Sequence, residues 1–183
     1  MRLIRLSFLL TLCLLPSLTS ALQVQIGITR PFVYIQIGNG QFGVFGLFGP
    51  PIGQVNEVTF DFAAGVLPGD GTPIVGTPEI PIAVLGYRGG GRARFTVTMN
   101  SSVPLVNANG DALPFNEISW TTRDGDIAGG TFNQGGAQTL FSMNIAYPRG
   151  RGVIDYMTFR YANDTVYPAG SYTGRVVYTI AQL

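Results

Sequence analysis

The sequence contains no histidine and no lysine, and its one cysteine, Cys13, lies close to the amino terminus. The chain therefore has no histidine to act as a base and, beyond Cys13, no cysteine to act as a nucleophile, and the usual zinc ligands are missing too. An intramolecular disulfide is excluded for the same reason. All basic residues are arginine, so a mechanism that depends on lysine is excluded.

The amino terminus has the composition of a secretory signal peptide. Arg2 and Arg5 precede an apolar run from Leu6 to Leu15, and small residues follow up to Ala21. The run is shorter than the roughly 20 residues that a membrane-spanning helix needs. We therefore expect cleavage after Ala21 and secretion of the remaining chain.

Removal of residues 1–21 leaves a domain-sized chain over 22–183. Nothing in it marks a linker or a repeat, so we expect a single domain. Loss of Arg2 and Arg5 changes the formal charge from +1 to −1, which gives no electrostatic support for a nucleic-acid partner.

Most of this chain alternates apolar and polar residues with a period of two, which is typical of half-buried strands. Glycine-rich and proline-rich turns separate the alternating segments, and no stretch has a sustained helical period. The pattern predicts an all-β fold, an immunoglobulin-like antiparallel β-sandwich. Strands are expected at 22–29, 32–37, 57–62, 80–85, 92–99, 118–121, 139–147, 153–161 and 172–180.

Several carboxylates could serve a glycosidase or a calcium site, because both need acidic groups that converge. Each of them stands beside glycine, in the Asp-Gly or Asn-Gly-Asp context that is typical of tight turns. The residues are Asp70, Asp111, Asp124 and Asp126. A turn role is favoured, so we expect no enzymatic activity, metal or cofactor, and a carboxylate-based secreted hydrolase ranks last.

Two features could contact a glycan. Arg88, Arg92 and Arg94 could bind an acidic sugar, although their alternation with Ala93 favours a hairpin loop and the solvent face of a strand. Trp120 could stack on a sugar ring, although a place in the core is favoured.

Two further motifs leave alternatives open. Asn100 and Asn163 each begin an Asn-x-Ser/Thr sequence, but both also stand beside turns. Three phenylalanines spaced three apart among glycines could form an exposed contact surface or turn into the core, and the core is favoured. They are Phe42, Phe45 and Phe48.

The segment from Pro168 to Thr179 runs Pro-Ala-Gly-Ser-Tyr-Thr-Gly-Arg-Val-Val-Tyr-Thr. It resembles the end of bacterial chaperone–usher fimbrial subunits, in which a Pro/Thr-Ala-Gly-x-Tyr-x-Gly turn precedes an alternating strand. The alternating segment 22–29 is similar to the N-terminal extension of these pilin-like subunits. The lack of cysteine in residues 22–183 matches the cysteine-free branch of the family.

This resemblance implies a structural subunit of a surface fimbria that contributes to adhesion. A periplasmic chaperone strand would first fill a groove in the incomplete sandwich, and an outer-membrane usher would then exchange it for the next subunit's extension. Such a head-to-tail contact propagates as a fibre of like subunits. The implied donor side chains are Leu22, Val24, Ile26 and Ile28, and the implied acceptor-groove wall is Tyr172, Val176, Tyr178 and Ile180.

The alternative is a self-complete secreted β-sandwich that binds carbohydrate or acts as a surface adhesin. In that case the strand at 22–29 pairs within its own domain.

Overall fold

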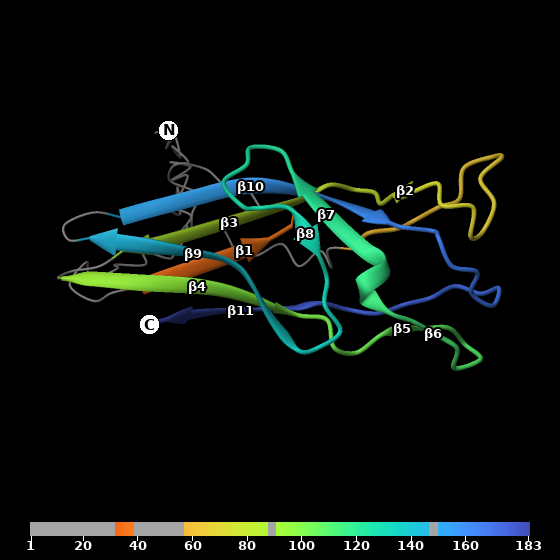
Figure 1. The fold of residues 1–183 in the computed structure, drawn as a ribbon. Coiled ribbons are helices and arrows are strands. Elements are labelled where there is room, and N and C mark those ends of the chain that lie inside the picture. Colours follow the sequence, from red (N-terminus) through yellow and green to blue (C-terminus); the bar gives the residue numbers. More distant parts are fainter. Residues whose placement is uncertain (1–31, 39–56, 88–90, 147–149) are drawn as a thin grey trace, which may run out of the picture.

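The computed structural model describes residues 32–38, 57–87, 91–146 and 150–183. Within these ranges the chain consists of strands, turns and one short 3₁₀ helix, η1 (Figure 1). No helix among the described residues is long and apolar enough to cross a membrane. The elements are β1 Phe32–Ile37, β2 Ile74–Val75, β3 Ile80–Tyr87, β4 Arg92–Asn100, β5 Leu105–Val106, β6 Ala112–Leu113, η1 Phe115–Glu117, β7 Ile118–Thr122, β8 Gly130–Thr131, β9 Ala137–Ala146, β10 Gly150–Tyr161 and β11 Val177–Gln182.

The strands form two larger sheets and one small ribbon. The first sheet has the order β1-β3-β10-β7-β8, with β2 paired to β10; the second has the order β11-β4-β9; β5 pairs with β6. Every pairing is antiparallel. The prediction of an all-β, antiparallel fold is therefore confirmed.

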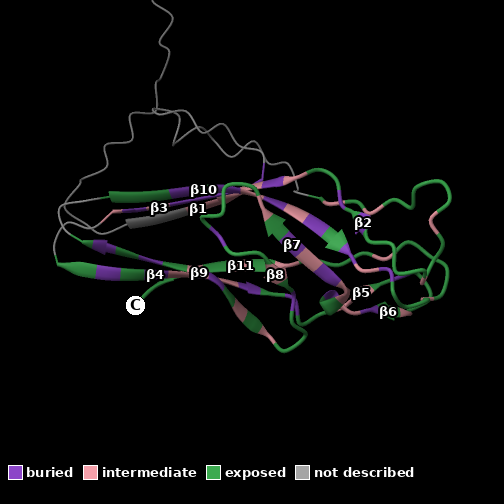
Figure 2. Ribbon diagram, turned by 45° about the horizontal axis from the view of Figure 1, so that its top comes forward, coloured by how far each residue is buried: buried purple, intermediate pink, exposed green. Residues whose placement is uncertain are grey.

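The core is a single apolar cluster to which both larger sheets contribute. Burial alternates along β4, where Ala93, Phe95, Val97 and Met99 are buried, and Figure 2 shows this alternation along the strand. Burial also alternates along β10, with Val153, Asp155, Met157, Phe159 and Tyr161 inward. The faces expected for the segments 92–99 and 153–161 are confirmed.

The strand expected at 57–62 is not present. The structure has a single bridge there, between Thr59 and Thr77, while Val58 and Phe60 pack against the core. Gly76 makes room for them, since a Cβ at that position would lie 2.5 Å from Val58 Cγ1. Apolar alternation in this segment therefore reflects packing over a neighbouring loop, without a strand partner.

The last strand is shorter than the expected 172–180, because β11 begins at Val177. The chain before it runs past β5, where Thr173 forms an isolated bridge with Val106. Gly174 permits the close approach, since a Cβ there would lie 2.9 Å from Leu105 Cγ. Residues 172–176 consequently contact the small ribbon and do not extend the second sheet.

Candidate functional site

Strand β11 forms one edge of the second sheet and pairs only with β4 in the described chain. Tyr178 lies opposite Met99, and Ile180 lies opposite Val97. Met99 and Val97 are almost fully buried, whereas Tyr178 and Ile180 are half-buried although they pack against the same core. Among the described strands, only β4 pairs alongside these two side chains.

Strand β1 forms an edge of the first sheet and has the same character. It pairs with β3, which places Ile35 opposite Val84 and Ile37 opposite Ile82. Val84 and Ile82 are buried, whereas Ile35 and Ile37 are half-buried against the core. This edge therefore also presents apolar side chains that one neighbouring strand leaves partly uncovered.

The edges formed by β1 and β11 lie close together. Their Cα atoms approach within 8 Å, but no ladder joins the two strands in the described ranges. Both views of the ribbon draw β1 near β11 (Figures 1 and 2). We call this pair of edges, with Ile35, Ile37, Tyr178 and Ile180, the open edge.

Burial shapes the electrostatics of the open edge. It raises the pKa of Tyr178 to about 12, because the apolar surroundings disfavour the charged phenolate. Neither β1 nor β11 contains an ionisable group other than tyrosine. The open edge is therefore neutral and apolar at physiological pH, which suits an apolar strand better than a polar substrate.

The expected groove wall divides into two parts. Tyr178 and Ile180 lie on β11, but Tyr172 and Val176 precede it. The Tyr172 hydroxyl donates to the Pro168 carbonyl oxygen at 2.8 Å, and its ring packs edge-on against Tyr167. Tyr172 thus belongs to a loop, and the structure brings Ile35 and Ile37 to the site in place of residues 172–176.

The carboxylates considered for catalysis or calcium lie in turns. Asp70 accepts hydrogen bonds from the amides of Leu67 and Thr72, and Asp111 accepts one from the Asn107 side chain. Asp124 and Asp126 flank Gly125, which has a φ of 78°. Within the described ranges, no group of three or more acidic, cysteine or histidine side chains could hold a metal ion.

Asp155 is a buried carboxylate that the sequence did not single out. Its Oδ1 accepts hydrogen bonds from the amides of Asp124 at 2.9 Å and Tyr156 at 2.8 Å, and its Oδ2 accepts one from Ile127 at 3.0 Å. Burial opposes its ionisation, but the backbone donors outweigh that effect and lower the pKa of Asp155. Asp155 holds the 123–127 turn.

Trp120 lies in the core, as the sequence favoured. It is 4% exposed, its indole nitrogen donates to the Ala128 carbonyl oxygen at 3.0 Å, and its ring centroid lies 5.1 Å from that of Phe132. A buried indole offers no stacking surface to a sugar.

The two Asn-x-Ser/Thr sites differ in exposure. Asn100 is exposed, and its side chain caps a turn at the amide of Ser102. Asn163 is fully buried with a φ of 54°, and its amide nitrogen donates to the Leu67 carbonyl oxygen and the Asp70 carboxylate. Asn163 is therefore an anchor for the 67–72 loop.

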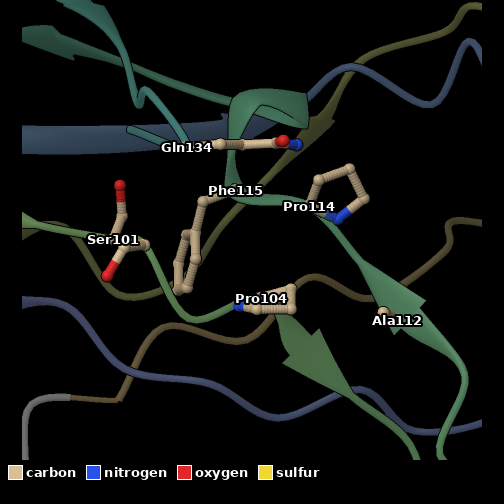
Figure 3. A pocket seen from close by; sticks show the side chains of 7 residues that line it. Ser101, Pro104, Ala112, Pro114, Phe115 and Gln134 are labelled. Atoms are coloured by element: carbon tan, nitrogen blue, oxygen red, sulfur yellow. The ribbon is translucent and has the colours of Figure 1, made fainter. Parts of the chain in front are cut away.

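A pocket of about 290 Å³ lies between η1 and the chain that follows β4 (Figure 3). Phe115 points between Ser101 and Pro104, and Pro114 lies on the other side of Phe115 from Ser101. The Gln134 amide donates to Asn116 at 2.8 Å, so its polar group already has a partner. No ionisable side chain lines this pocket, which therefore has no group for acid–base chemistry.

The implied donor residues Leu22, Val24, Ile26 and Ile28 lie outside the described residues, as do the signal peptide and the segment with Phe42, Phe45 and Phe48. Comparison of the chain with protein families, with curated proteins and with solved structures finds no match. The fold and the open edge are thus the observations on which a function can be argued.

Proposed function

We propose that this chain is a structural subunit of a surface fimbria, exported through the periplasm and assembled by strand donation between like subunits. The domain would be an incomplete immunoglobulin-like β-sandwich. The observation that carries the proposal is the open edge, where half-buried apolar side chains of β1 and β11 lie on neighbouring edges that no described ladder joins. A strand added to such an edge would gain backbone hydrogen bonds and seat alternate side chains against the core.

The composition of the two edges supports the same function. Natural proteins usually protect edge strands with charges, proline or bulges, because a bare edge recruits other strands. Neither β1 nor β11 contains a charged residue or a proline. Two unprotected edges side by side are therefore expected in a domain whose edges are covered by a further strand.

The segment 22–29 has the pattern that such a strand requires. Its apolar residues alternate with polar ones, so one face would meet the core while the other met solvent. Those on the apolar face are Leu22, Val24, Ile26 and Ile28. A periplasmic chaperone would cover the open edge before assembly, and an outer-membrane usher would direct the exchange.

The decisive experiment compares the processed chain, residues 22–183, with a variant that lacks residues 22–29. The complete chain should form a ladder of oligomers that resists mild detergent on unheated gels, whereas the deletion variant should stay monomeric. A synthetic peptide of residues 22–29 should bind the deletion variant and raise its melting temperature. A complete chain that purifies as a stable monomer would instead establish a self-complete binding module.

Two matched substitutions in the peptide sharpen the test. Ile26→Asp should abolish binding, because it would bury an unpaired carboxylate. Gln25→Asp puts the same charge on the opposite face and should retain binding. Equal loss with both peptides would contradict insertion of one face into the domain.

Two matched substitutions in β11 test the other side of the contact. Ile180→Asp should prevent oligomer formation, since Ile180 packs against the core at the open edge. Thr179→Asp is its control, because Thr179 is exposed on the other face of the same strand. Oligomers that form equally well with Ile180→Asp would show that the open edge is not the contact.

A further inference from the structure

The outward face of β4 carries two arginines near the beginning of the strand. Arg92 and Arg94 are exposed, while Ala93 and Phe95 between and after them are buried. Residues two apart in a strand lie about 7 Å apart on one face. The solvent-facing position expected from the sequence is confirmed, and it sets the two guanidinium groups side by side.

These arginines line an open depression of about 510 Å³ on the surface of the second sheet. Asn144 of β9 lies opposite Arg94, and Ala146 lies opposite Arg92. On the other side the amide of Leu183 donates to the Arg94 carbonyl oxygen at 2.8 Å, so Leu183 also borders the depression. We call this feature the arginine depression.

The guanidinium groups of the arginine depression form no ion pair with a described residue. The strands β4, β9 and β11 contain no acidic residue. The ion pair found in the described part of the chain joins Arg123 and Glu79, far from these strands in sequence. No described carboxylate, that of Leu183 included, forms an ion pair with Arg92 or Arg94. Both guanidinium groups keep their donors available to an anion from solution.

Hydroxyl groups continue the same face beyond the arginines. Thr96 lies opposite Ser142, and their hydroxyl oxygens are 3.0 Å apart. A guanidinium group binds carboxylate or sulfate through two parallel hydrogen bonds, whereas hydroxyl and amide groups suit sugar hydroxyls. We propose that the arginine depression binds an acidic oligosaccharide, with its anionic group on Arg92 and Arg94 and its hydroxyls on Asn144 and the Thr96–Ser142 pair.

The extent of the charge favours a sugar over larger polyanions. Recognition of an anionic membrane surface generally uses clusters of about 4–8 basic residues, and nucleic acid binding uses many phosphate contacts. The outward face of β4, β9 and β11 offers two arginines followed by neutral polar groups. Two cations and a row of hydroxyls match one or two acidic sugar units.

The test uses the complete processed chain and isothermal titration calorimetry at low salt. The probes are a carboxylated tetrasaccharide of galacturonic acid, a sulfated tetrasaccharide from heparin, neutral cellotetraose and inorganic phosphate. At least one acidic tetrasaccharide should bind, with an affinity that falls as salt is added. Comparing the two acidic probes distinguishes a preference for carboxylate from one for sulfate.

Matched variants locate the site. The double variant Arg92→Gln and Arg94→Gln should weaken binding about tenfold or more for each arginine, because it removes charge-assisted hydrogen bonds. Arg160→Gln changes an equally exposed arginine on β10, in the other sheet, and should bind like the original chain. Thermal melts of all variants should agree, since the three arginines are exposed.

Four outcomes would overturn the proposal. The first is that neither acidic tetrasaccharide binds at millimolar concentration. The second and third are that cellotetraose, or inorganic phosphate, binds as tightly as the acidic tetrasaccharides. The fourth is that Arg160→Gln loses as much affinity as the double variant of Arg92 and Arg94. Binding to anionic lipid vesicles without binding to the tetrasaccharides would overturn it too. Strand donation can fail its own tests without affecting any of these results, because the arginines face away from the core.

Discussion

Replacement of Asp155 by asparagine should destabilise the fold strongly, although the two side chains have nearly the same shape. Both carboxylate oxygens of Asp155 accept backbone hydrogen bonds, from Asp124 and Tyr156 on one oxygen and from Ile127 on the other. In Asp155→Asn one oxygen becomes an amide donor, which would face a backbone donor.

The loss can be sized from these contacts. Each hydrogen bond to a charged group contributes about 1.5–3 kcal/mol, and a neutral acceptor gives roughly half as much. Loss of one such bond and weakening of the other two should lower the free energy of unfolding by about 3 kcal/mol. Urea unfolding followed by the fluorescence of Trp120 measures this change through the midpoint, provided the slope stays constant.

The control is Asp126→Asn in the same turn. Asp126 is exposed, so the substitution should change stability by less than about 0.5 kcal/mol. If Asp155→Asn also stays within that limit, the buried carboxylate does not hold the turn as argued.

The same residue should shape the response to acid. Because the pKa of Asp155 is lowered in the fold, its contribution is fully present above the ordinary carboxyl value of about 3.9 and is lost as pH falls through the lower folded value. The original chain should therefore lose stability below about pH 4 more steeply than Asp155→Asn does. Identical acid profiles of the two proteins would refute the reasoning.

Two further predictions concern the core and the open edge. Gly130→Ala should lower the free energy of unfolding by about 1–3 kcal/mol, because its Cβ would lie 2.8 Å from the buried ring of Trp120. The control is Gly135→Ala, whose Cβ would meet nothing within 4 Å, so that its free energy of unfolding should not change. Chemical unfolding of both variants measures the difference. In a spectroscopic titration Tyr178 and Tyr167 should ionise with a pKa of about 12. Tyr178→Phe should remove one late-titrating group. Because the pKa of both tyrosines is raised in the fold, their contribution to the free energy of unfolding is fully present below about pH 10. This contribution is lost as the pH rises through about 12.

The sequence could predict the strands whose own alternation matches the final fold. Both β4 and β10 bury the faces that the period of two assigned to them. The turn at Gly110 and the turn at Gly125 were also predictable, since each has a positive φ that glycine adopts readily. These features are local, so neighbouring residues determine them.

The buried polar groups were harder to predict. Asp155 lies on the core-facing side of β10, between Val153 and Met157. A carboxylate at such a position needs hydrogen-bond donors around it, so the pattern indicates that donors are present. The donors come from residues 123–127, which are about thirty positions earlier, so their identity depends on how β7 and β10 pair. Asn163 is similar, because the loop that it anchors begins at Leu67.

The open edge shows most clearly what strand sequences alone leave undetermined. The alternation that includes Tyr178 and Ile180 predicts a half-buried strand, and an extended segment is expected at 32–37, but neither segment specifies its neighbours. Among the described strands, β3 pairs on that side with β1 and β4 pairs on that side with β11, and no further ladder follows. Strand order is fixed by the packing of the whole core. A pair of neighbouring edges is therefore a property of the assembled sheets, and the place of β1 beside β11 could be found only in the structure.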